Sequence, residues 1–221
     1  MMLPIGTFTL YHAFENCPHK AYHLYVAKTV PWVDTPEKVW GNYVHKGMEM
    51  RLRNGVELAE DLRAAEPFAA TLVGLGVEIE TELYIGMTEK GEHCTPRDDR
   101  VWFRGKIDVP IIQPPGAWLI DWKTGKPREE PFELETHALL LKCMHPELEN
   151  IVGNFYWFQT GKPGLRYSLN YHARTFAKLQ ALRTEMEGYA NSGHWPKRKN
   201  PLCGWCDVMS CEHNTSAKRK S

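Results

Sequence analysis

The sequence of 221 residues lacks several features that would place it quickly in a class of protein. No apolar run approaches the roughly 20 residues that a membrane-spanning helix needs. The first residues, MMLPIGTFTLYHAF, have no basic flank followed by an apolar stretch, so we expect no secretory signal. There is no Walker A motif, and there are no repeats or low-complexity linkers. These absences argue against a membrane protein and a P-loop ATPase, and they favour a cytoplasmic protein.

The sequence also lacks an excess of charge of either sign. It has 27 basic and 27 acidic residues, so the formal net charge is zero. A protein that coats nucleic acid by charge alone is usually strongly basic, so the balance counts against that class but still allows a locally basic cleft. The C-terminal run SAKRKS is basic and polar, and we expect residues 213–221 to form a disordered tail.

Hydrophobic residues make up 43% of the chain, which is enough for one core. Apolar residues at helical spacing predict helices over residues 37–54, 60–75, 131–144 and 174–193, the second interrupted at Pro67. Strand patterns cover residues 77–86, 101–112 and 117–125, and a hairpin is expected within residues 151–172. This order predicts an α/β fold with a mixed central sheet flanked by helices, in a single domain over residues 1–212.

The stretch WLIDWKTGK, residues 118–126, places a carboxylate and an ammonium two residues apart in a predicted strand. Because side chains alternate along a strand, Asp121 and Lys123 point to the same side. Neighbours at i and i+2 are poorly placed to pair, so a structural ion pair is the weaker explanation. A metal ion and its substrate between the two side chains would account for both charges.

Further potential metal ligands lie on the neighbouring predicted elements. Asp108 is on the preceding strand, Glu80 is on the strand before that, and His45 faces inward from the helix at 37–54. Taken singly, such an aspartate is more often a turn residue, and such a histidine is more often a core residue. As an ordered set they suit Mg²⁺ or Mn²⁺, and Lys123 could hold a phosphate oxygen or help to activate a water. The set therefore indicates metal-assisted hydrolysis of phosphodiester bonds.

The ordered motifs CPHKAY, GNYVHKG, GKIDV and IDWKTGK resemble those of the RecB-like branch of the PD-(D/E)xK nucleases. That branch includes CRISPR-associated RecB-like exonucleases, the AddB nuclease domain and many phage exonucleases. The resemblance runs from Cys17 to Cys211 and implies a restriction-endonuclease-like core. It assigns Asp108 to the first acidic position, and Asp121 and Lys123 to the (D/E)xK pair.

The resemblance also implies roles for residues outside those motifs. His45 matches a histidine that approaches the metal from an early helix, and Glu80 matches a frequent extra acidic residue. The branch usually carries a glutamine and, four residues later, a tyrosine on the helix after the lysine strand. This sequence has Glu133 and His137 there instead, one turn apart on one helix face. Glu133 is either a further metal or water contact or a solvated acid near a helix start.

The segment CGWCDVMSC brings Cys203, Cys206 and Cys211 close together in the sequence. In an intracellular protein such spacing indicates metal binding rather than disulfides. The resemblance implies a [4Fe–4S] cluster with Cys17 as the fourth ligand, so that residues 200–212 clasp the N-terminal segment. A zinc site with His213 or Cys17 as its fourth ligand, and a metal-free end, remain alternatives.

The resemblance implies a Mg²⁺- or Mn²⁺-dependent deoxyribonuclease, expected to be an exonuclease in phage or bacterial DNA recombination or degradation. The expected partner is DNA, as single strands or duplex ends, and a separate helicase or recombination protein would supply any unwinding. We expect the cytoplasm of a bacterial or phage-infected cell and no membrane association. The alternative is a non-catalytic nucleic-acid-binding or assembly module with the nuclease fold, although such a module would not need Asp108, Asp121 and Lys123 together.

Overall fold

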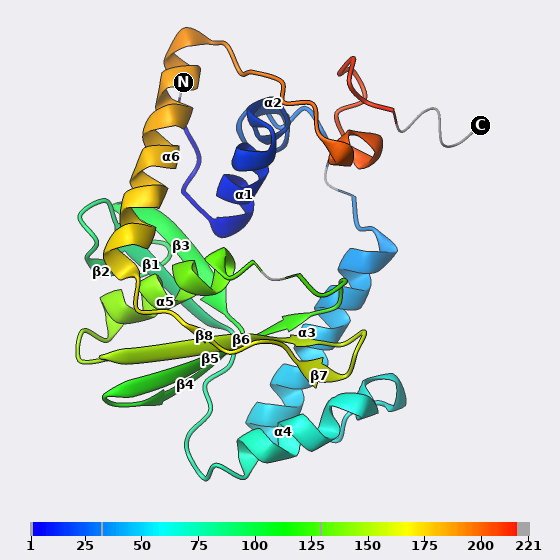
Figure 1. Cartoon of the computed structure of the whole chain (residues 1–221), viewed down its shortest axis with the longest axis vertical. Helices are drawn as coiled ribbons and strands as arrows, with labels where there is room; N and C mark the ends of the chain where they lie inside the picture. Colours follow the sequence, from blue (N-terminus) through cyan, green and yellow to red (C-terminus); the bar gives the residue numbers. More distant parts are fainter. Residues whose placement is uncertain (1, 32, 129, 216–221) are drawn as a thin grey trace. The chain divides into compact units, whose positions relative to one another are not determined.

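The computed structural model describes residues 2–31, 33–128 and 130–215, and the chain divides into two compact units (Figure 1). The central unit comprises Asp34–Phe176, and the terminal unit comprises Met1–Val33 together with Ala177–Ser221. The expected single domain over residues 1–212 stays a prediction. The expected disordered tail, residues 213–221, lies outside the described residues from position 216 onward.

The central unit contains two sheets (Figure 1). The first is antiparallel with the order β2–β1–β3, formed by β1 (Leu83–Thr88), β2 (His93–Cys94) and β3 (Val101–Ile107). The second has the order β4–β5–β6–β7, formed by β4 (Val109–Gln113), β5 (Gly116–Lys123), β6 (Asn150–Trp157) and β7 (Lys162–Pro163), and β8 (Tyr167–Ser168) also pairs with β6. Among the described strands of the second sheet, β5 and β6 run parallel and the other pairs are antiparallel, so the sheet is mixed, which confirms the predicted α/β class.

Two sets of helices in the central unit pack on this framework. On one side lie α3 (Pro36–Asn54), the 3₁₀ helix η2 (Glu60–Ala65) and α4 (Glu66–Val73), and they share a core with β4, β5 and β6. Helix α5 (Phe132–Met144) contacts β1, β3, β5 and β6. The last helix, α6 (His172–Ser192), begins in the central unit and continues into the terminal unit.

The helix ends follow from local sequence. Thr35 caps α3 by accepting a hydrogen bond from the Lys38 N–H, and Gly55 ends the helix in the left-handed conformation that glycine adopts readily. The predicted interruption at Pro67 is a helix start: η2 ends at Ala65, and Pro67 occupies the first turn of α4. Proline is tolerated there because the N–H groups of a first turn have no intrahelical acceptor.

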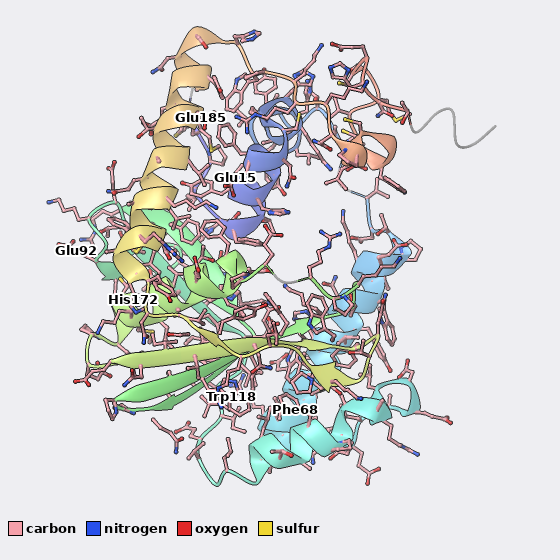
Figure 2. The ribbon with its side chains drawn as sticks, viewed as in Figure 1. Glu15, Phe68, Glu92, Trp118, His172 and Glu185 are labelled. Atoms are coloured by element: carbon pink, nitrogen blue, oxygen red, sulfur yellow. The ribbon has the colours of Figure 1, made fainter. Side chains whose placement is uncertain are left out.

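The alternation of side chains along β5 separates a core face from a polar face. Ile120 and Trp122 are buried in the core beneath α3 and α4, where Phe68 and Trp118 also lie (Figure 2), with ring centroids 6.1 Å apart. Asp121, between Ile120 and Trp122, therefore points to the opposite side, toward α5. The core on one face thus fixes where the carboxylate on the other face must lie.

The structure corrects two of the predicted strands. The expected strand at residues 101–112 is broken at Asp108, because β3 pairs with β1 whereas β4 pairs with β5. The expected strand at residues 77–86 begins only at Leu83. Glu82 has a φ of 57°, a left-handed backbone that interrupts an extended chain. Residues 77–82 are therefore not part of β1.

The terminal unit is formed by both ends of the chain. It contains α1 (Phe8–Asn16), α2 (Pro18–Ala21), the π-helix η1 (Tyr22–Val26), most of α6 and the 3₁₀ helix η3 (Pro201–Trp205). Phe14 of α1 packs edge-on against Trp195 at 6.3 Å. The Arg198 guanidinium donates to the Glu15 carbonyl oxygen and to Glu185. None of the described helices is long and apolar enough to cross a membrane.

Substitution of Gly86 tests the packing of the first sheet. It pairs with Cys94 and Arg104 on either side, and a Cβ added there would lie 2.7 Å from the Thr95 carbonyl oxygen. Because backbone must move to admit it, we expect Gly86→Ala to lower the free energy of unfolding by about 1–3 kcal/mol. Urea denaturation followed by circular dichroism measures the change.

Gly188→Ala on α6 is the matched control for that substitution. A Cβ at Gly188 would meet nothing within 4 Å, and alanine favours a helix over glycine by about 1 kcal/mol. This variant should be as stable as the original protein or more stable. A Gly86→Ala protein with unchanged stability would contradict the packing described for β1.

Candidate active site and cysteine site

Asp108 and Asp121 lie opposite each other where the chain passes from the first sheet to the second. Val109 pairs with Ile120 in the antiparallel β4–β5 ladder, so the next residues in each direction are the two aspartates. Asp108 Oδ2 accepts a hydrogen bond of 2.8 Å from the Trp122 N–H, which fixes its carboxylate beside the end of β5. Both side chains are almost fully buried. Burial, together with the charge of Asp121, raises the pKa of Asp108.

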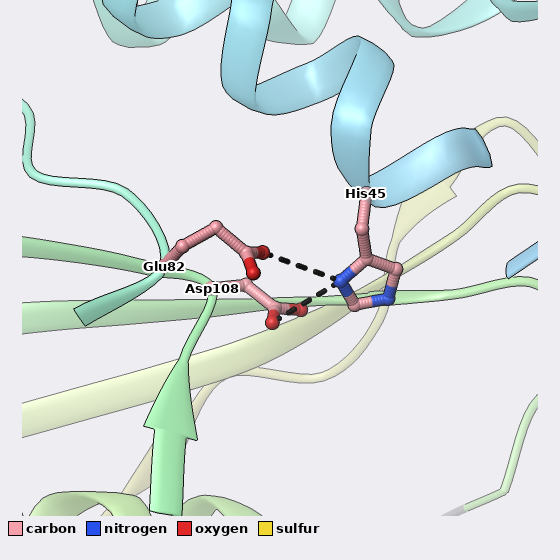
Figure 3. A group of neighbouring side chains, drawn as sticks. All are labelled: His45, Glu82 and Asp108. Atoms are coloured by element: carbon pink, nitrogen blue, oxygen red, sulfur yellow. Dashed lines mark ion pairs between the residues drawn. The ribbon is translucent and has the colours of Figure 1, made fainter. Parts of the chain in front are cut away.

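A histidine and a second carboxylate complete one cluster around Asp108 (Figure 3). His45 reaches from α3, and its Nδ1 atom lies 3.3 Å from Asp108 Oδ1 and 3.6 Å from Glu82 Oε1. One potential ligand atom from each of the three residues lies within 4.8 Å of the others. We call His45, Glu82 and Asp108 the α3 group.

The charges in the α3 group are mutually dependent. Burial alone would lower the pKa of His45, but hydrogen bonding with Asp108 and Glu82 raises it to about 10. Burial would raise the pKa of Glu82, but its contacts with His45 and Lys106 lower it overall. In the metal-free protein a proton on His45 therefore balances the carboxylates at neutral pH. A divalent cation would have to replace that proton to bind the imidazole.

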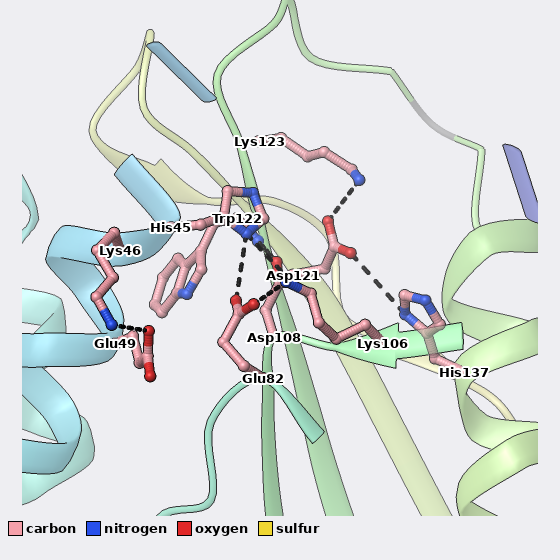
Figure 4. Close-up of polar contacts among 10 residues, drawn as sticks. All are labelled: His45, Lys46, Glu49, Glu82, Lys106, Asp108, Asp121, Trp122, Lys123 and His137. Carbon is pink, nitrogen blue, oxygen red and sulfur yellow. Dashed lines mark hydrogen bonds and ion pairs between the residues drawn. The ribbon is translucent and has the colours of Figure 1, made fainter. Parts of the chain in front are cut away.

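Asp121 belongs to a second cluster on the α5 side (Figure 4). Glu133 and His137 come from α5, and one potential ligand atom from each of these three residues lies within 4.8 Å of the others. His137 Nδ1 is 3.9 Å from Asp121 Oδ1. We call Asp121, Glu133 and His137 the α5 group.

Lys123 makes ion pairs within the α5 group. Its Nζ atom lies 2.7 Å from Asp121 Oδ2 and 2.7 Å from Glu133 Oε2. The expectation that Asp121 and Lys123 would not pair is therefore wrong, because the long lysine side chain turns back to the carboxylate on its own face. Burial would lower the pKa of Lys123, but the two carboxylates raise it overall, so the side chain stays an ammonium. Burial and the charge of Asp121 raise the pKa of Glu133 to about 7.

A family model described as the PD-(D/E)XK nuclease superfamily matches residues 7–211. The chain belongs to the PD-(D/E)XK nuclease superfamily. Membership implies a nucleic-acid substrate and a divalent metal ion, and the oxygen-rich donor sets of the two groups fit such an ion. No curated protein matches the chain in sequence.

Solved structures show the same fold at low sequence identity. The chain covers 88% of a "Putative exonuclease" from Eubacterium rectale, with 95% of its own length aligned, 12% identity and a TM-score of 0.58. It covers 90% of the protein SSO0001, with 97% of its own length aligned, 16% identity and a TM-score of 0.54. These similarities support the restriction-endonuclease-like core of this superfamily member.

The structure brings together most of the residues expected at the nuclease site. His45, Asp108, Asp121, Lys123, Glu133 and His137 all lie in the two groups or bridge them. Glu80 does not: it is exposed and precedes β1. Glu82 takes the place expected for Glu80 beside Asp108, and its N–H donates to the Asp108 carbonyl oxygen at 2.8 Å.

The register of the strands in the structure selects Glu82. Leu83 pairs with Ile107 in the antiparallel β1–β3 ladder, so the preceding residue, Glu82, meets Asp108. Alternation alone does not distinguish Glu78, Glu80 and Glu82, since all three have the same parity along the chain. Only the end of the ladder selects between them. The catalytic and metal-binding roles expected for the site residues stay predictions.

The four cysteines expected to bind a metal line one cavity of about 360 Å³ in the terminal unit. Cys17 Sγ accepts a hydrogen bond from the Arg198 N–H at 3.5 Å, and Cys203 Sγ accepts one from the Asn200 N–H at 3.4 Å. Cys206, Cys211 and His213 line the same cavity. Thiols are the donors that a [4Fe–4S] cluster or a zinc ion takes, but among the described residues no three of these sulfur atoms lie within 4.8 Å of one another, so the expected clasp stays a prediction.

The raised pKa of His45 predicts a pH-dependent stability. The folded-state pKa of about 10 exceeds the ordinary 6.5, so the contribution is fully present below pH 6.5 and is lost as the pH rises toward 10. In EDTA we expect the Tm of the protein to fall over this window more than the Tm of His45→Gln. A contribution of 1 kcal/mol corresponds to about 2–4 °C in a chain of this size.

Thermal melts from pH 6 to pH 10, with EDTA and with Mn²⁺, measure this effect. Because the ion replaces the proton on His45, the stabilisation by Mn²⁺ should grow with pH in the original protein. If the Tm of the original protein and the Tm of His45→Gln change equally with pH in EDTA, His45 does not hold the proton.

Proposed function

We propose that the chain is a Mg²⁺- or Mn²⁺-dependent deoxyribonuclease that hydrolyses phosphodiester bonds. The observation that carries the proposal is the facing pair of buried carboxylates, Asp108 and Asp121, with His45 and Lys123 beside them. A structural role would be met more simply by apolar residues at these buried positions, since buried like charges oppose folding.

Asp108 and His45, which share a cluster with Glu82, would hold the catalytic ion together with Asp121, which faces Asp108 from β5. When bound, a divalent cation supplies charge neutralisation at the scissile phosphate and acidifies the attacking water. Asp108 is held for this task by its bond to the Trp122 N–H, and His45 is held by the rigid frame of α3. His45 therefore comes from a helix and Asp121 from a strand, while Asp108, between β3 and β4, is fixed by its hydrogen bond.

Lys123 would stabilise the negative charge that develops on the phosphate. Its raised pKa keeps it protonated, so it serves as an electrostatic partner rather than as a base. Glu133, whose pKa is about 7, is the better proton acceptor near the site, because a base works best when its pKa lies near the working pH. The pair thus divides electrostatic and proton-transfer roles between two adjacent side chains.

We also propose membership of the RecB-like branch and exonuclease action on single-stranded or duplex DNA ends. His45 on the helix preceding the strands and the four-cysteine cavity support the branch. The similarity to the Eubacterium rectale protein named an exonuclease supports the mode of action. A role in bacterial or phage DNA recombination or degradation in the cytoplasm, beside a helicase or recombination partner, belongs to the same proposal.

The cysteine cavity is proposed to hold a [4Fe–4S] cluster, with zinc as the alternative. Both chain ends contribute ligands, Cys17 from one end and Cys203, Cys206 and Cys211 from the other. A metal bound by all four would cross-link segments far apart in the sequence and stabilise the terminal unit.

Cleavage of labelled DNA tests the nuclease assignment. We expect activity with Mg²⁺ or Mn²⁺ and none in EDTA, and we expect Asp121→Asn and Lys123→Met each to lower the rate by about 10²-fold or more. Circular dichroism and DNA binding should be largely unchanged. Asp98→Asn is the control, because that aspartate pairs with Arg100 outside both groups and should leave the rate within about twofold.

Two results would contradict the assignment. Tight DNA binding without cleavage in any divalent metal would favour a binding module. Full activity of Asp121→Asn would show that the facing carboxylates do not serve the chemistry.

Iron and sulfide analysis tests the cysteine site. Protein purified without oxygen should be brown, with about four iron atoms per chain. Cys203→Ser should remove the colour and lower the Tm, while Cys143→Ser, whose thiol donates to the Gly91 carbonyl oxygen in the central unit, should keep the colour. Colourless protein with about one zinc per chain would show that the site holds zinc instead of the cluster. Metal-free protein that is as stable as its Cys203→Ser variant would rule out both metals.

A further inference from the structure

The outer face of the first sheet carries an exposed aromatic ring beside two cationic side chains. Gly105 of β3 faces α5, since a Cβ there would come within 2.8 Å of Leu140. Because side chains alternate along a strand, Arg104 and Lys106 point to the opposite face. Tyr84 pairs with Lys106 in the β1–β3 ladder, so its ring lies on that outer face too. We call Tyr84, Arg104 and Lys106 the outer strip.

The outer strip is open to solvent where it approaches the metal site. Tyr84 is 43% exposed, and the side chain of Lys106 is 51% exposed. The Lys106 ammonium pairs with Glu82, a member of the α3 group (Figure 4). Farther from the site the backbone covers this face, because a Cβ on Gly86 would lie 2.7 Å from the Thr95 carbonyl oxygen. The open surface is therefore continuous with the proposed catalytic centre.

Among the described residues, no carboxylate forms an ion pair with Arg104. Its Nη1 atom donates to the Pro96 carbonyl oxygen at 3.0 Å, and its guanidinium carbon lies 5.8 Å from the centroid of the Tyr84 ring. These two contacts hold the guanidinium beside the ring. A carbonyl oxygen and a ring carry no net charge, so the guanidinium keeps a full positive charge with which to attract an anion.

We propose that the outer strip binds a single-stranded segment of the DNA substrate, with a nucleobase stacked on Tyr84 and a phosphate held by Arg104. An aromatic face beside a fixed cation suits single strands, because every base has a flat face and every linkage carries a negative charge. Lys106 follows Arg104 by about 7 Å along the strand, toward the metal site, a distance comparable to the spacing of neighbouring phosphates in an extended single strand.

The inference rests on the proposed function and adds to it a preference for single strands. Bases inside a duplex are stacked on one another, so they offer no free face to the Tyr84 ring. A strand that reaches the metal site along β3 would pass Arg104 first and Lys106 second. The outer strip would thereby position the strand before its scissile phosphate meets the catalytic ion.

DNA binding by an inactive variant tests the proposal without cleavage. In Asp121→Asn with Mg²⁺, fluorescence anisotropy gives the Kd of a labelled oligothymidine and of an abasic strand of equal length. Adding Tyr84→Leu should weaken binding of the oligothymidine about tenfold and leave the abasic strand within about twofold, because only the former offers a base to stack. Tyr84→Phe keeps the ring and should bind both strands as its parent does.

The salt dependence of binding separates the phosphate contact from stacking. Arg104→Gln should weaken both strands, by about fivefold at 0.1 M salt, and should reduce the slope of log Kd against log salt concentration by about 0.7. Tyr84→Leu should leave that slope unchanged. Arg166→Gln is the matched control, because its guanidinium also lies over an aromatic ring, 5.1 Å from the centroid of Trp118, but on the face of β5 that points away from Asp121. Its Kd and slope should equal those of the parent.

Two binding results would overturn the outer strip while cleavage by the original protein leaves the proposed nuclease intact. One is an oligothymidine Kd that Tyr84→Leu does not change. The other is an equal loss of affinity in Tyr84→Leu for the oligothymidine, the abasic strand and a duplex, which would show that the ring does not stack on an unpaired base. Binding that depends on Tyr84 and Arg104 as predicted, with no cleavage of any DNA by the original protein, would support the outer strip and overturn the proposed function.

Discussion

The passage of the chain from one sheet to the other at Asp108 is the constraint on which the site depends. β3 pairs with β1 up to Ile107, and β4 pairs with β5 from Val109 onward. The one residue between them, Asp108, therefore belongs to neither ladder. The freed residue is an aspartate, and its carboxylate is fixed by the Trp122 N–H at 2.8 Å. That hydrogen bond places the Asp108 carboxylate, which lies between the two sheets, against Asp121 of the second sheet.

The same arrangement concentrates negative charge in a buried place. Glu82, Asp108, Asp121 and Glu133 converge around it, and Lys106, Lys123 and His45 supply the opposing charges. Without an ion, crowded and desolvated carboxylates oppose folding, which is why the pKa values of Asp108 and Glu133 rise. The apolar core on the other face of β5, around Ile120 and Trp122, offsets this cost and holds the strand in register.

Much of this arrangement of site residues could be predicted from periodic patterns in the sequence. Alternation in WLIDWKTGK fixed Asp121 and Lys123 on one face of a strand, and helical spacing fixed Glu133 and His137 one turn apart. Their meeting at one site required only that α5 cover that face. The resemblance of motifs to RecB-like nucleases supplied Asp108 and His45, which periodicity could not have joined to the same place.

Other features could not be predicted, for identifiable reasons. The break at Asp108 is not marked in the sequence, because β3 (VWFRGKI) and β4 (VPIIQ) are separated by this one residue, with no glycine or loop segment between them. Glu82 was missed because its left-handed backbone ends the extended conformation, which no residue-type rule forecasts for a glutamate. The pairing of Lys123 with both Asp121 and Glu133 depends on side-chain conformations rather than on spacing.

The most direct test of this account is a crystal structure of the protein with Mn²⁺, with the ion located by its anomalous scattering. The account predicts a strong peak about 2.2 Å from carboxylate oxygens of both Asp108 and Asp121, and at a similar distance from the Nδ1 atom of His45. A Mn²⁺-saturated crystal with no peak between the two aspartates, and with the Asp108 and Asp121 side chains unchanged, would contradict it.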